Sequence, residues 1–346
     1  MEQMKTPVSK KNPAFNRLLK NTIEIPDSPA MPCIGMGSGV NVYSFARSPM
    51  GGQARSPWAI KKINRKVTVP EYESRLLAEV DVLRNLKHPN IVGFRAVVES
   101  KDGHKCLAME ECETSLGDLI EERGETSKEP FAVDNILTVA SDICKALSYL
   151  HDECLLLHGD LKSYNVLIRG DFEVAKLCDF GVTVRVNTKG VALPDQYYVG
   201  TKIWSAPEVL ENDGAGVTTK ADIFSYGLVL WEMLSLRPPH IPEEIPDDPS
   251  DNDDPSDNDD PSGNDDPSGN DDPSGNDDPS GNDDPSGSSC EESFFGKLGT
   301  RPELPTGLSS VYDEVIYLFN WCCEAEPDAR PSAIQIQDFL QASKMQ

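Results

Sequence analysis

Apolar residues change their spacing along the chain near residue 112. Before that point most apolar runs are short and bounded by glycine, proline or asparagine, a pattern typical of β-strands. One segment, residues 71–87, repeats leucine or valine every three or four positions and predicts a helix. Strand-like runs follow at 91–98 and 106–110. Residues 31–112 are therefore expected to form a β-rich lobe with one main helix.

Beyond residue 113 the apolar spacing is mostly helical. The longest amphipathic segment, 132–151, repeats isoleucine, valine or leucine every three or four positions. Further helical segments are expected at 116–123, 221–236, 311–323 and 332–342. Residues 113–346 are therefore expected to form a helical lobe, and the chain an α+β fold with two lobes.

An acidic insert interrupts the second lobe at residues 241–295. Between Asp247 and Gly287 the hexamer Asp-Asp-Pro-Ser-(Gly/Asp)-Asn recurs, and its seventh copy is truncated. The repeat has no apolar residue to bury, and its regular prolines forbid a helix, so we expect a disordered surface loop. The insert holds 16 Asp and 4 Glu and no Lys or Arg, so it carries −20 of the net charge of −26 and leaves −6 elsewhere. This balance argues against a nucleic-acid partner, which would require clustered Lys and Arg.

Residues 1–30 are polar, basic and interrupted by prolines, which predicts a disordered tail. Within this tail, Thr6-Pro7 is a candidate site for an upstream proline-directed kinase. The nine cysteines include no Cys-x-x-Cys pair, so neither a zinc site nor a disulfide framework is expected. No N-terminal signal pattern is present, and no apolar run approaches the roughly 18 residues of a membrane helix. We expect a cytoplasmic or nuclear protein without a membrane partner.

Chemically active side chains are concentrated between His158 and Gly181. They recur at short offsets and are Asp160, Lys162, Asn165 and Asp179. Strand-like runs at 166–168 and 174–177 lie between the last two, and a hairpin there would bring all four side chains to one pocket. A base, a cation and two Mg²⁺ ligands are the groups that phosphoryl transfer requires.

A glycine-rich turn, residues 35–39, precedes this group and lies between two strand-like runs. Glycines allow backbone N–H groups to approach phosphate oxygens closely. A dinucleotide-binding turn would be followed directly by a helix, whereas a strand follows here. Lys61 ends the next strand, and Glu79 lies on the predicted helix. We expect Glu79 to hold Lys61 against a nucleotide phosphate.

The series His158-x-Asp160-x-Lys162-x-x-Asn165, followed by Asp179-Phe-Gly, resembles the catalytic segment of the eukaryotic protein kinases. The resemblance covers residues 31–343 outside the insert and implies a bilobal kinase fold that uses ATP and Mg²⁺. It implies that Asp160 orients the substrate hydroxyl and accepts its proton, while Lys162 steadies the γ-phosphate. Asn165 and Asp179 would hold Mg²⁺.

The same resemblance implies a set of nucleotide contacts. Met109 resembles the gatekeeper residue, Glu110 to Cys112 the adenine-binding hinge, and Ala59 and Leu167 the residues that enclose adenine. The expected contacts are Ile34, Gly35, Gly37, Ser38, Gly39, Val42, Ala59, Lys61, Met109, Glu110, Cys112 and Leu167.

Two further positions concern the substrate class and the control of activity. Lys162, in the order Asp-x-Lys-x-x-Asn, resembles serine/threonine kinases, as does Thr201, which would contact Asp160. Gly159 replaces the usual arginine before Asp160, so activation through an arginine-held phosphate is not expected. Val40 replaces the last glycine of the glycine-rich turn. These two departures support the alternative function, that of a pseudokinase scaffold.

Several polar residues are expected to be structural. His158 would pack under Phe180 rather than act as a base, and Cys178 would be a buried thiol. Asp222 resembles the acid that anchors the catalytic loop. A buried ion pair is expected between Glu208 and Arg330.

Longer segments resemble one MAP-kinase-kinase-like subfamily, the PDZ-binding kinases. They are Ile34–Tyr43, Ser56–Ile63, His88–Gly93, Leu107–Glu110, Asp118–Arg123 and Leu157–Ser163. The resemblance implies serine/threonine or dual specificity, a mitotic role, protein substrates such as MAP kinases, and phosphorylation of Thr6 by a cyclin-dependent kinase. Lys344 and Gln346 do not supply the side chains that a PDZ groove binds, which argues against a PDZ partner.

Overall fold

The computed structural model describes residues 31–37, 39–63, 70–100, 105–211, 216–241 and 296–343. The tail with Thr6, Ser38, the hexamer repeat and residues 344–346 lie outside the described residues, so the expectations for them stay predictions. Contacts divide the chain into two units, Met1–Pro239 with Leu298–Gln346, and His240–Lys297. The helices and strands given below belong to the first unit.

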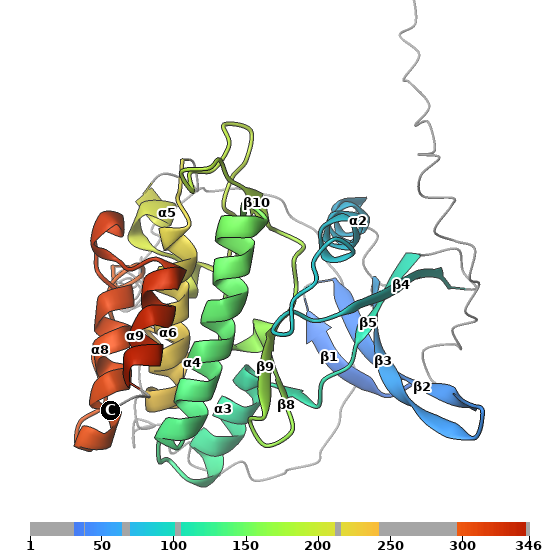
Figure 1. The fold of residues 1–346 in the computed structure, drawn as a ribbon, viewed down its shortest axis with the longest axis horizontal. Helices are drawn as coiled ribbons and strands as arrows, with labels where there is room; N and C mark the ends of the chain where they lie inside the picture. The colour runs from blue at the N-terminus through green and yellow to red at the C-terminus, as the bar shows by residue number, and fades with distance from the viewer. Residues whose placement is uncertain are drawn as a thin grey trace, which may run out of the picture. The chain divides into compact units, whose positions relative to one another are not determined.

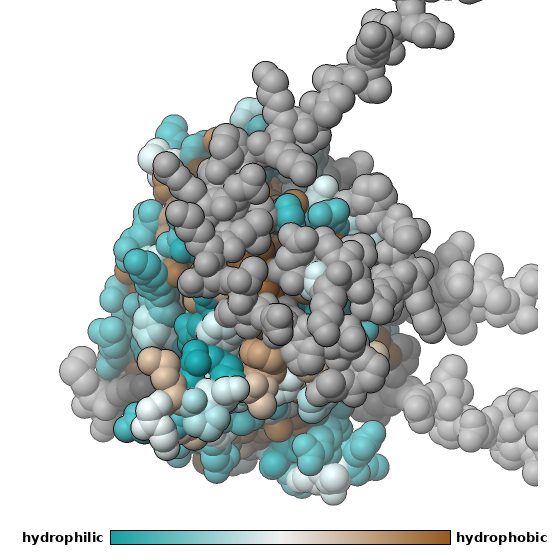
Figure 2. All heavy atoms as spheres, turned by 90° about the vertical axis from the view of Figure 1, so that its right-hand side faces the viewer, coloured by the Kyte–Doolittle hydropathy of each residue, from teal (hydrophilic) through white to brown (hydrophobic). Residues whose placement is uncertain are grey.

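The N-terminal lobe is a five-stranded antiparallel sheet with one helix, α2 (Pro70–Leu83). The sheet order is β1-β2-β3-β5-β4. The strands are β1 (Cys33–Gly37), β2 (Val40–Met50), β3 (Gln53–Ile63), β4 (Phe94–Glu99) and β5 (Lys105–Glu110). Leu76, Val80 and Leu83 of α2 are buried in the core, as the three- and four-residue spacing predicts. Figure 2 views the molecule from the side of this sheet, where hydrophilic and hydrophobic residues adjoin one another.

Two predicted boundaries in this lobe were wrong. Helix α2 ends at Leu83 rather than 87, because the N–H groups of Asn85 and Leu86 donate to carbonyls three residues earlier and Asn85 Nδ2 donates to the Asp81 carbonyl. Strand β4 begins at Phe94 rather than 91. The N–H of Val92 instead donates to Leu177 of the other lobe at 2.9 Å, so this segment connects the lobes.

The C-terminal lobe is mainly helical (Figure 1). Its main helices are α3 (Leu116–Thr126), α4 (Val133–Ser148), α5 (Pro207–Glu211), α6 (Lys220–Ser235), α8 (Asp313–Cys322) and α9 (Ala333–Ser343). A π-helical turn, Tyr149–Glu153, continues α4. Helix α6 is buried from Ala221 to Leu234, so the other helices pack around it. The predicted α+β fold is confirmed. In the described part of the chain, no helix has the length and apolar character needed to cross a membrane.

A hairpin of β8 (Val166–Arg169) and β9 (Val174–Leu177) lies to the left of the N-terminal sheet in Figure 1. The register pairs Val166 with Leu177 and Leu167 with Lys176, so the predicted hairpin is confirmed. A short strand, β6 (Thr114–Ser115), extends it and pairs with Ile168 and Leu167. Because β6 directly follows the hinge, the hairpin is joined to the point where the chain enters the C-terminal lobe.

The predicted ion pair between Glu208 and Arg330 is present. Arg330 Nη1 and Nη2 donate to Glu208 Oε1 and Oε2 at 2.7 and 2.8 Å. Arg330 also donates to the carbonyls of Glu324, Ala325 and Lys220. A buried guanidinium is tolerated when its donors are satisfied in this way, so the pair fixes α5 against the loop before α9.

Candidate active site

Lys61 of β3 lies between two carboxylates. Its Nζ is 2.8 Å from Glu79 Oε2 on α2 and 2.9 Å from Asp179 Oδ1, which follows β9. Burial would lower the pKa of Lys61, but the charges and hydrogen bonds of both carboxylates outweigh it and raise this pKa. Burial would likewise raise the pKa of Asp179, but Lys61 keeps it below its usual range. Both groups are therefore charged, and the Asp179 side chain is 41% exposed.

Asp160 is held by three side chains from its own loop and from the segment before α5. Thr201 Oγ1 donates to Asp160 Oδ1 at 2.6 Å, and Lys162 Nζ lies 3.0 Å from Oδ2. Lys162 Nζ also donates to Thr201 Oγ1 at 2.8 Å. Asn165 Nδ2 donates to the Asp160 carbonyl at 2.7 Å and to Oδ2 at 3.1 Å. Residues predicted to act together are therefore in contact.

Asp222, at the start of α6, anchors the loop that contains Asp160. It is fully buried, and its carboxylate accepts the backbone N–H groups of His158 at 2.7 Å and Gly159 at 3.1 Å. His151 Nε2 lies 2.8 Å from the same carboxylate. Burial would raise the pKa of Asp222, but the hydrogen bond and charge of His151 lower it. The predicted anchoring contact is confirmed.

His158 has the structural environment that the sequence predicts. Its ring lies 5.1 Å from the ring of Phe180, and its Nε2 is 3.0 Å from the Cys178 carbonyl. Burial raises the pKa of the Cys178 thiol well above its usual value, which agrees with the expected unreactive thiol.

Gly159 adopts a backbone conformation that explains its identity. Its φ of 81° lies in the left-handed region, and a Cβ atom there would be 2.6 Å from the Val182 carbonyl oxygen. A side chain at this position would therefore be strained and would displace the segment after Asp179.

Several of the predicted nucleotide contacts lie on neighbouring strands of the N-terminal sheet. The register places Gly35 opposite Val42, Val42 opposite Lys61, and Ala59 opposite Met109. Leu167 lies on β8, in the three-stranded sheet of β6, β8 and β9.

The remaining described contacts lie at the glycine-rich turn and at the hinge. Ile34 is exposed on β1, Gly37 ends that strand, and Gly39 has a φ of 77°. Cys112 follows β5, and burial raises the pKa of its thiol to about 11.

A family model described as "Protein kinase domain" matches residues 30–340 of the chain. The chain belongs to the protein kinase family. Such enzymes transfer phosphate from ATP to protein substrates, typically with a divalent metal ion.

Known relatives indicate which subfamily of protein kinases this chain is similar to. The human lymphokine-activated killer T-cell-originated protein kinase, the PDZ-binding kinase, is 43% identical over 92% of this chain and 91% of its own length. The cell division control protein 7 of Schizosaccharomyces pombe is 34% identical over 60% of this chain, but that match covers 18% of the yeast protein. The dual specificity protein kinase shkD of Dictyostelium discoideum is 30% identical over 60% of this chain and 26% of its own length. The first match confirms the predicted subfamily resemblance.

The side-chain oxygens of Asn165 and Asp179 are ligands of the kind that a hard divalent cation such as Mg²⁺ prefers. Asn165 and Asp179 offer oxygen donors, and the Cys178 N–H donates to the Asn165 carbonyl at 3.0 Å, which keeps the two segments adjacent. Among the described residues, no three His, Cys, Asp or Glu side chains form a group that could hold a metal ion. Mg²⁺ suits such a site because it is commonly held by one or two protein ligands together with substrate phosphates and water.

Sequence reasoning missed Glu232 and its two partners. Glu232 of α6 is 1% exposed, and its carboxyl accepts Ser163 Oγ at 2.7 Å and Trp204 Nε1 at 2.8 Å. Burial raises the pKa of Glu232 to about 8 although both hydrogen bonds lower it. Ser163 belongs to the catalytic loop, and Trp204 follows Thr201. An acid within an otherwise apolar helix was the signal that could have revealed this contact.

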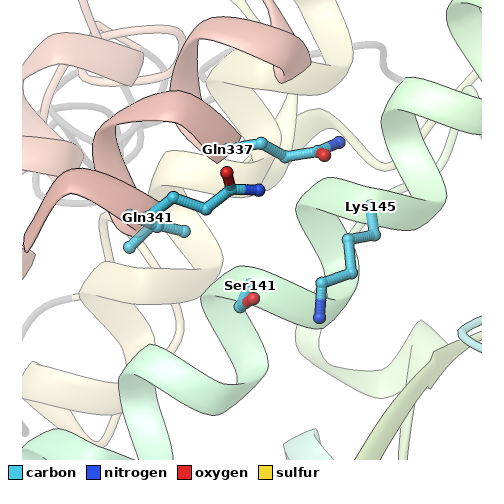
Figure 3. A pocket seen from close by; sticks show the side chains of 5 residues that line it. Ser141, Lys145, Gln337 and Gln341 are labelled. Atoms are coloured by element: carbon cyan, nitrogen blue, oxygen red, sulfur yellow. The ribbon is translucent and has the colours of Figure 1, made fainter. Parts of the chain in front are cut away.

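A small hollow on the C-terminal lobe is separate from these residues (Figure 3). It lies between α4 and α9, has a volume of about 150 Å³, and is lined by Ser141, Lys145, Gln337, Leu340 and Gln341. Lys145 Nζ is already paired with Asp142 Oδ1 at 3.1 Å. The hollow contains none of the predicted site residues.

Proposed function

We propose that this kinase transfers the γ-phosphoryl group of ATP to serine and threonine hydroxyls of proteins, with Mg²⁺ as the metal ion. The observation that carries the proposal is the contact of Thr201 and Lys162 with both carboxylate oxygens of Asp160. This arrangement involves the residues through which the sequence resembles serine/threonine kinases. Dual specificity, which would add tyrosine, is an outcome of the test.

Each residue has a defined task in the proposed reaction. The acceptor oxygen bonds to the γ-phosphorus as the bond to the β–γ bridging oxygen breaks, and ADP leaves. Asp160 accepts the hydroxyl proton, and Lys162 stabilises the charge on the transferred phosphoryl group. Lys61, held by Glu79, binds the α- and β-phosphates. Asn165 and Asp179 would hold Mg²⁺, which neutralises phosphate charge.

Adenine recognition is assigned to the sheet and the hinge. The backbone from Glu110 to Cys112 would bind the adenine edge, with Met109 behind it. Ala59 and Leu167 would enclose the ring. The glycine-rich turn, including Ser38, would cover the phosphates.

The cellular context rests on the relatives. The human protein that covers most of this chain supports a MAP-kinase-kinase-like enzyme with protein substrates such as MAP kinases. Two more distant relatives are named for cell division and cytokinesis, which supports a role in mitosis. In this proposal a proline-directed kinase acts on Thr6, and the enzyme is cytoplasmic or nuclear.

A peptide library with serine, threonine or tyrosine as the only acceptor tests the function. The purified kinase should phosphorylate serine and threonine peptides in ATP and Mg²⁺, and chelation of the metal by EDTA should abolish transfer. Transfer to tyrosine alone would contradict the assignment. Nucleotide binding without transfer to any acceptor would favour the pseudokinase scaffold.

Replacing Thr201 with alanine should lower kcat about tenfold, since one of the three side-chain contacts that hold the Asp160 carboxylate would be lost. Thr201→Ser keeps the hydroxyl and is the matched control, expected to retain kcat within about threefold. Steady-state assays with saturating ATP and peptide measure both. Equal rates for Thr201→Ala and wild type would show that the Thr201 contact does not orient the base.

A further inference from the structure

The carboxylate of Glu110 lies among cationic side chains from three strands. Its Oε2 accepts the N–H of Gly93 at 3.1 Å and lies 3.2 Å from Lys176 Nζ. Arg169 approaches Oε1 at 3.6 Å, and Arg95 approaches Oε2 at 3.9 Å. A single carboxylate therefore balances charges contributed by β4, β8 and β9.

The elements joined by this carboxylate carry the predicted nucleotide and metal contacts. Glu110 is the last residue of β5, where the chain leaves the N-terminal sheet. Lys176 lies on β9, three residues before Asp179, and pairs across the hairpin with Leu167. The Glu110–Lys176 ion pair thus links the hinge to the hairpin that carries an expected adenine contact, Leu167, and precedes an expected metal ligand, Asp179.

Burial distinguishes this ion pair from an ordinary surface pair. The side chains of Lys176 and Glu110 are 9% and 15% exposed. Removing one partner from a shielded pair leaves an uncompensated charge in a low dielectric, whereas exposed pairs contribute little. Arg169 and Arg95 are more exposed and more distant. Lys176 is therefore the principal partner of Glu110.

We propose that Glu110 and Lys176 are positioning residues whose ion pair fixes the hinge against Leu167 and Asp179 and thereby sets the affinity for ATP. In the structure, this pair coexists with the 2.8 Å contact between Lys61 and Glu79. It therefore belongs to the arrangement in which the catalytic side chains are assembled. The inference rests on the proposed binding of adenine by the hinge.

The variants Glu110→Gln, Lys176→Met and their double combination test the inference. Glu110→Gln should raise KM for ATP about tenfold and change kcat less than about threefold, because the chemical groups are untouched. Amide hydrogen exchange at residues 110–113 should accelerate in the same variant without nucleotide. The double variant should show no larger KM change than Glu110→Gln, because it leaves no ammonium without a partner. Glu122→Gln, an exposed change on α3, is the control.

The readouts separate this inference from the proposed function. Hydrogen exchange needs neither ATP nor catalysis, so it tests the ion pair even if wild type transfers no phosphate. Unchanged exchange at 110–113 would overturn the inference. So would a fall in kcat at constant KM, which indicates a loss of folded enzyme only. A rise in kcat/KM would also overturn it, since the pair would then restrain the active arrangement.

Discussion

Replacing Asp160 with alanine is expected to lower the rate of phosphate transfer by about a thousandfold or more. The proposed general base would be lost, and Thr201 and Lys162 would lose the carboxylate that they orient at 2.6 and 3.0 Å. ATP binding should persist, because Lys61, Glu79 and the hinge are unchanged. Single-turnover assays measure the chemical step, and an ATP-dependent thermal shift measures binding.

Asp81→Ala is a matched control for this variant. Asp81 is an exposed aspartate on α2 whose pairing with Arg84, at 3.4 Å, is of the surface type. Its loss should leave both rate and ATP binding near wild type. If Asp160→Ala transferred phosphate at the wild-type rate, Asp160 could not be the base. If it lost the thermal shift as well, the defect would lie in folding or binding.

Local sequence predicted the catalytic loop because its groups are close along the chain. The offsets from His158 to Asn165 and the two apolar runs before Asp179 require one hairpin, and that hairpin is present. Lys61 and Glu79, 18 residues apart, could be paired because a strand end and an inward helix face restrict where their side chains lie. The periodicity of apolar residues and the resemblance to protein kinases were together sufficient to predict this part of the fold.

Contacts made between distant segments were not predictable in the same way. The pattern at 91–93 is that of a strand, yet the Val92 N–H donates to Leu177, more than 80 residues away. Tertiary pairing there overrides strand propensity. The side chain of Glu110 was expected at the hinge, but no local pattern indicates that Lys176 and Gly93 bind it.

Glu232 illustrates the same limit, and its titration has a testable consequence. Ser163 and Trp204, its partners, lie 69 and 28 residues away in the sequence. The folded pKa is about 8 against an ordinary value of 4.5, so between these values the folded protein binds more protons at this site than the unfolded chain. Stability must therefore fall as pH rises through this window. The full contribution of Glu232 to the free energy of unfolding is present below pH 4.5.

Replacing Glu232 with glutamine should remove this pH dependence. A glutamine stays neutral, and its amide oxygen can accept a hydrogen bond from Ser163 Oγ or Trp204 Nε1, as the Glu232 carboxyl does. Relative to this variant, wild type should lose about 2 kcal/mol of unfolding free energy between pH 6 and pH 8. Denaturant unfolding at the two pH values measures the difference, with Glu122→Gln as an exposed control that should follow wild type.

Catalysis provides a second measurement of the same titration. Ionised Glu232 would place an uncompensated charge between the catalytic loop and the segment after Thr201, because its 1% exposure excludes water. We expect kcat of wild type to fall above pH 8 while kcat of Glu232→Gln stays level over that range. If wild type and Glu232→Gln showed the same pH dependence of stability and the same pH dependence of kcat, Glu232 would ionise at an ordinary pKa. The buried hydrogen bonds to Ser163 and Trp204 would then be made by a carboxylate that is charged throughout the neutral range.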